Sequence, residues 1–245
     1  FIANERTKAP HYALVSAGPL FFMDPELTAD RRGQDMAKAD ALAKSLATLR
    51  LAVFAPGKND FAAGPEALAK LTKTSGAEVL LANADGAVPI QKSGIVREIN
   101  GVKFGFIGAS LAKESRPIAD AVKSAAAELK KEGAQVLVAV LAVGRGEAKR
   151  VADAVPDLAA IVVGSPGGRG EANTKTPPAE RVGNVVIAET GNHLQTVVAL
   201  DFFVRAREQI AVDAAGILGV DVRHSWLQML ACQAIFLLRL PFAGW

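Results

Sequence analysis

Short apolar runs alternate with amphipathic stretches over most of this chain. Runs such as Leu51–Phe54 and Gln135–Val143 are apolar at nearly every position, which is typical of strands covered on both faces. In Gln34–Arg50, apolar residues recur every three or four positions, which favours an amphipathic helix. The pattern predicts further strands and helices in the order Tyr12–Val15, Pro65–Thr74 (helix), Glu78–Ala82, Ile95–Ile107, Pro117–Glu132 (helix), Gly146–Val155 (helix), Leu158–Val163, Val182–Glu189 and Thr196–Val204. This alternation predicts an α/β fold.

Turn residues sharpen two of these assignments. Asn100-Gly101 joins two β-rich runs within Ile95–Ile107, and this pair favours the type I′ turn of a two-residue hairpin. Gly133 follows the apolar face of Pro117–Glu132, where glycine suits a left-handed helix cap. A β-hairpin and a capped helix are therefore predicted in the middle of the chain.

The end of the chain departs from this pattern. We expect one domain over residues 1–205 and an apolar tail over residues 206–245. Trp226–Trp245 is about long enough to span a bilayer, but Gln228, Gln233, Arg239 and Pro241 interrupt it. We therefore expect Trp226–Leu238 to form a helix that packs on the domain or on a protein partner, in preference to membrane association.

Composition excludes several classes of protein. With 245 residues, half of them hydrophobic, the chain can bury a full core, so extended disorder is excluded. The net charge of +3 is mild and the basic residues are scattered, which argues against nucleic acid as a partner. The single Cys232 allows neither an internal disulfide nor a cysteine zinc site. Phe1–Arg6 lacks the basic and apolar regions of a signal peptide.

The loop after Leu51–Phe54 carries the most informative motif. Gly57-Lys58-Asn59-Asp60-Phe61, followed by Gly64, resembles the Gly-Asn-His-Asp/Glu-Phe signature of calcineurin-like metallophosphatases of the 5'-nucleotidase branch. In that family the asparagine binds metal and the histidine is catalytic, and these positions are Lys58 and Asn59 here. The resemblance implies an αββα sandwich of two mixed sheets flanked by helices, whose N-terminal strand is possibly missing here, and a periplasmic or cell-surface location. It runs from about Tyr12 to Val204.

The other metal-ligand positions of the family are also changed. The resemblance aligns the metal-bridging aspartate with Pro19, and it aligns three ligand histidines with Ala142, Ser165 and Gly167. Ala82-Asn83 partly matches a family Ser-Ala-Asn, whose asparagine lies near the metal cleft, although Asn83 suits an ordinary turn equally well. We therefore expect neither catalytic residues nor metal ligands in this chain.

Two glycine-rich segments are weaker signals. Gly164–Gly170 lacks the Lys-Ser/Thr ending of a phosphate-binding P-loop, so a surface loop is favoured. Gly191-Asn192-His193 spells the signature tripeptide of the family, but Leu194 follows where an acidic residue is required. We interpret this tripeptide as a turn between edge strands.

The function implied by these changes is that of a degenerate, non-catalytic metallophosphatase-like domain that binds a ligand or a protein partner, the partner through the tail. We expect no cofactor. The alternative is an active phosphoesterase with two divalent ions such as Mn or Zn, whose remaining ligands come from a segment upstream of Phe1. As a third possibility, the chain is a structural or membrane-associated module built around the tail.

A weak site for an anion such as phosphate is expected where the metals were lost. Lys58, Arg145 and Arg169 lie in loops at the carboxyl ends of predicted parallel strands, where α/β sheets form ligand sites. Solvated surface cations are the alternative interpretation of these three residues. The candidate ligand-binding set is Lys58, Asn59, Asp60, Asn83, Arg145, Ser165 and Arg169.

Overall fold

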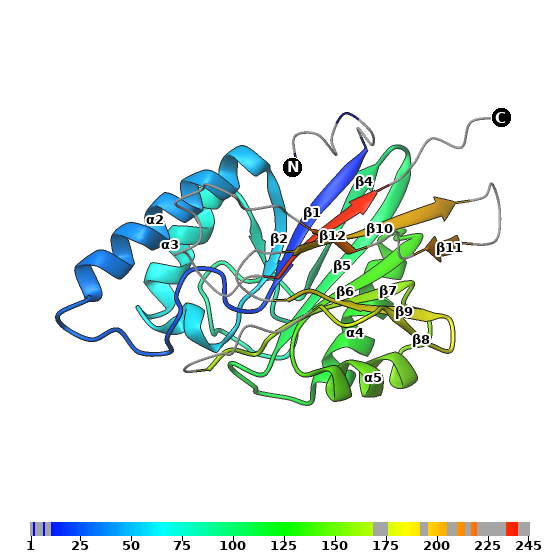
Figure 1. Ribbon diagram of the computed structural model, residues 1–245. Coiled ribbons are helices and arrows are strands. Elements are labelled where there is room, and N and C mark those ends of the chain that lie inside the picture. Colours follow the sequence, from blue (N-terminus) through cyan, green and yellow to red (C-terminus); the bar gives the residue numbers. More distant parts are fainter. Residues whose placement is uncertain are drawn as a thin grey trace.

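The computed structural model describes residues 2, 7, 11–168, 176–191, 196–204, 210–213, 217–219 and 234–239. For residues 196 and 204 and for the last three ranges, Leu238 excepted, only the backbone is described. Figure 1 shows two β-sheets packed face to face, with α2 and α3 outside one sheet and α4 and α5 outside the other. This arrangement confirms the expected αββα sandwich.

The first sheet has seven strands in the order β11-β10-β13-β1-β2-β3, with β12 paired to β10. β1, β2 and β3 run parallel, whereas β13 is antiparallel to β1 and parallel to β10. The strands of this sheet and the helices that cover it are β1 (Tyr12–Ala17), α2 (Arg32–Leu49), β2 (Leu51–Ala55), α3 (Pro65–Ser75), β3 (Glu78–Val79), β10 (Thr196–Val204), β11 (Ile210–Asp213), β12 (Ile217–Gly219) and β13 (Ala234–Arg239). A short 3₁₀ helix, η1 (Lys58–Phe61), follows β2.

The second sheet has six strands in the order β4-β5-β6-β7-β9-β8. Its central strands β5, β6, β7 and β9 are parallel, and both edge strands are antiparallel to their neighbours. Its elements are β4 (Gly94–Ile99), β5 (Val102–Ser110), α4 (Ile118–Lys131), β6 (Val136–Ala142), α5 (Arg145–Ala154), β7 (Ala160–Gly164), β8 (Glu180–Val182) and β9 (Val185–Glu189). All seven residues of β6 are buried, as its continuous apolar run predicts.

Three apolar clusters hold these layers together. The cluster between the sheets includes Val15, Val53 and Val138 and an edge-to-face contact of Phe104 with Phe202. A second cluster lies under α2 and α3, and a third under α4 and α5. Each sheet therefore buries both faces, which fixes the positions of the loops at its strand ends.

The hairpin predicted from Asn100-Gly101 is confirmed. Ile99 pairs with Val102, and the two turn residues have φ angles of 50° and 76°, as a type I′ turn requires. Gly133 has a φ angle of 91° directly after α4 and Glu132, in agreement with its predicted role.

Two assignments were wrong in detail. Val182–Glu189 is not one strand, because Gly183, with a φ angle of 58°, turns the chain between β8 and β9. In Glu78–Ala82 only the first two residues form a strand, and Leu80 makes an isolated bridge to Lys92.

The helix expected at Trp226–Leu238 was also wrong where the structure describes it. Ala234–Arg239 is a strand that lies between β1 and β10, and Figure 1 shows it in red in the middle of the first sheet. Both neighbours offer unpaired backbone groups, which only a strand can satisfy along its whole length. Residues 226–233 lie outside the described part, and the domain boundary expected at residue 205 stays a prediction.

The described residues form helices of moderate length and mixed polarity. None of these helices combines the length and the apolarity needed to cross a membrane.

Candidate functional site

Three loops meet at the carboxyl ends of β1, β2 and β7. We call residues 18–23, 57–61 and 165–168 the three-loop junction. The first two loops come from one sheet and the third comes from the other. The backbone N–H of Lys58 donates to the Pro166 carbonyl oxygen at 2.7 Å, and that of Gly18 donates to Ala55 at 3.0 Å. The positions that the family resemblance implies for metal ligands, Ala142 excepted, lie in this junction.

Asp60 joins two loops of the junction. Its side chain is fully buried. Its Oδ1 accepts the N–H groups of Leu20 and Phe21, both at 2.8 Å, and its Oδ2 accepts the N–H of Gly57 at 2.9 Å. Burial raises the pKa of Asp60 to about 7, although the three backbone N–H groups act in the opposite direction. The carboxylate is therefore directed at the backbone and holds the loop after β1 against the turn after β2.

Asn59 occupies the position of the family's catalytic histidine, and it too is fully buried. Its Nδ2 donates to the carbonyl oxygens of Met23 at 2.5 Å and Gly168 at 3.0 Å. This amide therefore links the loop after β1 to the loop after β7, across the two sheets. Its Oδ1 is buried without a hydrogen-bond partner.

Lys58 and Ser165 are the other described members of the predicted set that lie in the junction. The Lys58 side chain is exposed, whereas its backbone N–H is used by Pro166. The Oγ of Ser165 accepts the N–H of Gly167 at 3.0 Å. Arg169 lies outside the described residues. The junction thus brings together Lys58, Asn59, Asp60 and Ser165.

Asn83 belongs to a different contact. Its Nδ2 donates to the Ser110 carbonyl oxygen at 2.8 Å, and its Oδ1 accepts the Ser110 N–H at 3.0 Å. Its own carbonyl oxygen accepts from Ser115 and Arg116. These bonds join the chain after β3 to the end of β5. Asn83 therefore acts as a buried link between loops.

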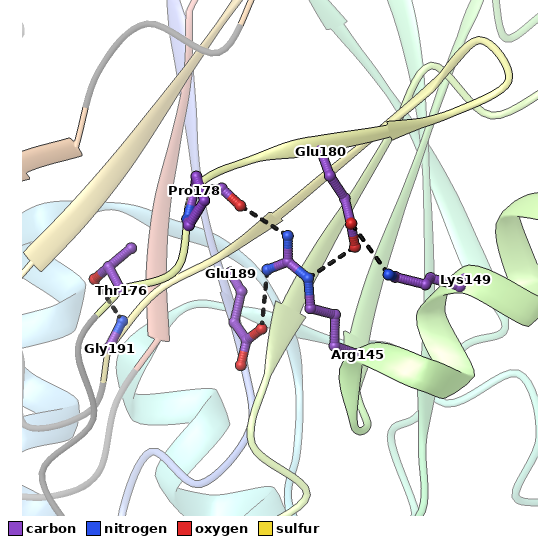
Figure 2. A network of polar contacts seen from close by, with 7 residues as sticks. All are labelled: Arg145, Lys149, Thr176, Pro178, Glu180, Glu189 and Gly191. Carbon is purple, nitrogen blue, oxygen red and sulfur yellow. Dashed lines mark hydrogen bonds and ion pairs between the residues drawn. The ribbon is translucent and has the colours of Figure 1, made fainter.

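Arg145 is held by carboxylates. Figure 2 shows its guanidinium between Glu180 and Glu189, with donor distances of 2.8 and 3.3 Å, and a third bond of 2.7 Å to the Pro178 carbonyl oxygen. Lys149 also reaches Glu180 at 3.1 Å. Hydrogen bonds from Arg145 and Lys149 hold the pKa of Glu180 below its usual value. The charge expected to bind an anion is thus already paired, so among the described residues the anion site rests on Lys58 and stays a prediction.

No local sequence pattern indicates that these two carboxylates contact Arg145. Glu180 and Glu189 lie 35 and 44 positions from Arg145. The parallel pairing of β6, β7 and β9 brings the strand ends together. Such a contact requires knowledge of the strand order, and no local pattern contains it.

The side chains at the implied ligand positions do not fit a metal pair. Pro19, Ala142 and Gly167 offer no side-chain donor atom. The described residues contain no cluster of three or more His, Cys, Asp or Glu side chains that could hold a metal ion. Asp60 and the Asn59 amide nitrogen are committed to the backbone. A site for two divalent cations requires several anionic or imidazole ligands around both ions.

Comparison with solved structures places this geometry in a known fold. A protein from Staphylococcus aureus assigned as a 5'-nucleotidase aligns with a TM-score of 0.64 and 13% identity over 88% of this chain and 48% of its own. The Thermus thermophilus 5'-nucleotidase precursor aligns with a TM-score of 0.53 and 16% identity over 94% of this chain and 55% of its own. The T. thermophilus sulfate thiohydrolase SoxB aligns with a TM-score of 0.59 and 15% identity over 74% of this chain and 35% of its own.

These likenesses show the calcineurin-like metallophosphatase fold that the sequence motifs suggested. The chain spans about a third to just over half of the length of these structures. Comparison of the sequence with protein-family models and with curated proteins finds no match. At this level of identity, the fold is shared, and the activity has to be argued from the residues of this chain.

Proposed function

We propose that this chain is a non-catalytic metallophosphatase-like domain that acts as a binding or interaction module. One observation carries the proposal: the two polar side chains at the centre of the signature motif, Asn59 and Asp60, are buried and bonded to backbone groups. These two side chains hold the loops of the three-loop junction together. A side chain that is committed in this way cannot also hold a metal or move a proton without breaking the junction.

The chemistry of the family supports the same conclusion. Two divalent ions about 3.5–4 Å apart generate hydroxide and clamp the phosphate in such enzymes. Among the buried side-chain atoms of the three-loop junction, the Asn59 Oδ1 has no hydrogen-bond partner, and one neutral oxygen is a poor ligand set for a divalent cation. Asp60 could serve only by releasing Leu20, Phe21 and Gly57.

The activity test measures the hydrolysis of phosphate esters in the presence of added metal ions. Nucleoside monophosphates and p-nitrophenyl phosphate are offered to the purified protein with added Mn²⁺ or Zn²⁺, and no turnover is expected. Turnover that survives repurification and is abolished by Asp60→Ala would favour the alternative, an active phosphoesterase. Because Asp60 also supports the fold, circular dichroism of the variant must show that it remains folded.

The ligand that we propose for this module is a phosphate-containing molecule bound weakly at Lys58, and a protein partner contacts the C-terminal tail. The exposed ammonium of Lys58 at the edge of the junction supports the first part. The family resemblance supports a periplasmic or cell-surface location. Phosphate titration should shift the amide resonances near Lys58 in the parent protein and in Lys44→Ala, a control on the exposed face of α2, but not in Lys58→Ala. Equal shifts in all three proteins would exclude the site.

A further inference from the structure

Two lysine side chains that follow strands of different sheets converge on the short helix η1. Lys58 begins η1 after β2, and Lys113 lies in the loop that follows β5. The ammonium nitrogen of Lys113 lies 5.7 Å from the centre of the Phe61 ring, and Phe61 ends η1. This distance is within the range of about 6 Å over which a cation is attracted to an aromatic face. The Phe61 ring therefore holds the charge of Lys113 beside η1.

The geometry of η1 brings Lys58 into reach of the same place. In a 3₁₀ helix, side chains three positions apart lie on the same side, and each residue advances about 2 Å along the axis. Lys58 and Phe61 are three positions apart, so their side chains leave the same side of η1, about 6 Å apart along its axis. Asn59 and Asp60, between them, are buried. The two lysines can therefore bring their ammonium groups to one face of η1.

The charges of these two lysines are available to a ligand. Both residues are exposed, and among the described residues no carboxylate lies within ion-pair distance of either ammonium group. In this they differ from Arg145, whose charge is shared by two glutamates. An ammonium group offers three donors and no acceptor, so it binds anions. Two such groups at one place favour a ligand with two negative charges, and a phosphate ester approaches that charge above its second pKa of about 6.

We propose that Lys113 is the second cation of the phosphate site at Lys58, and that this site takes a dianionic phosphate group. The inference rests on the proposed function, which includes a weak phosphate site at Lys58, and deepens it by naming a second binding residue and the charge of the ligand. Lys113 contacts the ligand directly. Phe61 is a positioning residue, because its ring keeps Lys113 near η1.

The main test is a titration with inorganic phosphate at about pH 8, where phosphate is mostly dianionic, and at constant ionic strength. The amide resonances of residues 57–61 and 111–113 report binding. Lys113→Met should raise the Kd about two- to fivefold, the usual range for one exposed charge contact. Lys113→Arg keeps the charge and should bind as tightly as the parent protein. Lys103→Met, which removes an exposed lysine at the opposite end of β5, should leave the Kd unchanged.

The charge of the anion and the aromatic ring allow two further measurements. Nitrate carries one charge, so it should bind the parent protein more weakly than phosphate does, and Lys113→Met should narrow this difference. Phe61→Leu should raise the Kd for phosphate in the parent background but not in Lys113→Met, because the ring acts through Lys113. Methyl phosphate is titrated in parallel, since the tighter of the two ligands identifies an ester or the free ion as the preferred source of the dianion.

Two kinds of failure can be told apart. A Kd that is the same in Lys113→Met and in the parent protein, with binding lost in Lys58→Ala, would overturn the role of Lys113 and leave the site at Lys58 intact. Phosphate-induced shifts that persist unchanged in Lys58→Ala would instead contradict the phosphate site of the proposed function.

Discussion

Asp60→Asn separates the charge of the buried carboxyl group from its shape. Burial raises the pKa of Asp60 from 3.8 to about 7 in the folded protein. Between these values the folded state binds more protons than the unfolded state, so this group stabilises the fold at low pH and loses its contribution as the pH rises toward 7. About three pKa units at ~1.36 kcal/mol each set an upper bound of about 4 kcal/mol.

The assay is urea unfolding of the parent protein and Asp60→Asn at several pH values from about 4 to 8. The difference in unfolding free energy, parent minus variant, should fall by up to about 4 kcal/mol over this range. Asp40→Asn, on the exposed face of α2 with Lys44, controls for general charge effects. A difference that rises with pH would refute the reasoning, because it would mean that the three N–H groups stabilise the carboxylate more than burial opposes it.

Further predictions concern the glycine turn, the arginine network and the tail strand. Gly101→Ala should cost about 1–2 kcal/mol in urea unfolding, because position 101 has a φ angle of 76°; an unchanged midpoint would argue against the type I′ turn. Arg145→Met should destabilise by about 1–2 kcal/mol at low salt and less at high salt, since its partly exposed carboxylate partners are screened; a loss independent of salt would contradict an electrostatic role. Leu238→Ala should cost about 2–5 kcal/mol in thermal unfolding, because Leu238 is buried between the sheets; a loss below about 1 kcal/mol would argue against β13 as an inner strand.

Local patterns predicted those parts of the fold whose cause is local. Asn100-Gly101 fixes its hairpin because both residues accept positive φ angles. Helix α4 follows from the apolar face that includes Val122, Ala126 and Leu129. Continuous burial of β6 follows from its apolar run. In each case the residues that cause the structure are neighbours along the chain.

Contacts between distant segments could not be predicted in the same way. The run Ala234–Arg239 is compatible with a buried helix or a buried strand, and the gap between β1 and β10 decides the outcome. The carboxylates around Arg145 likewise depend on strand order.

The position of the motif loop along the chain was predicted, but the contacts of its side chains were not. The glycine frame around Asp60 correctly indicated a loop at the carboxyl end of β2. The sequence could not show that Asp60 and Asn59 face backbone groups of loops 36–40 and 109 positions away. The identity of a polar residue in a motif does not show whether its side chain binds a ligand or a neighbouring loop.

We propose that this chain has the metallophosphatase fold without its metal-binding chemistry. The most direct measurement is the metal content of the purified full chain after dialysis against Mn²⁺ and Zn²⁺, with hydrolysis of p-nitrophenyl phosphate followed on the same sample. We expect no stoichiometric metal and no turnover. Two ions per chain, together with metal-dependent hydrolysis, would contradict it.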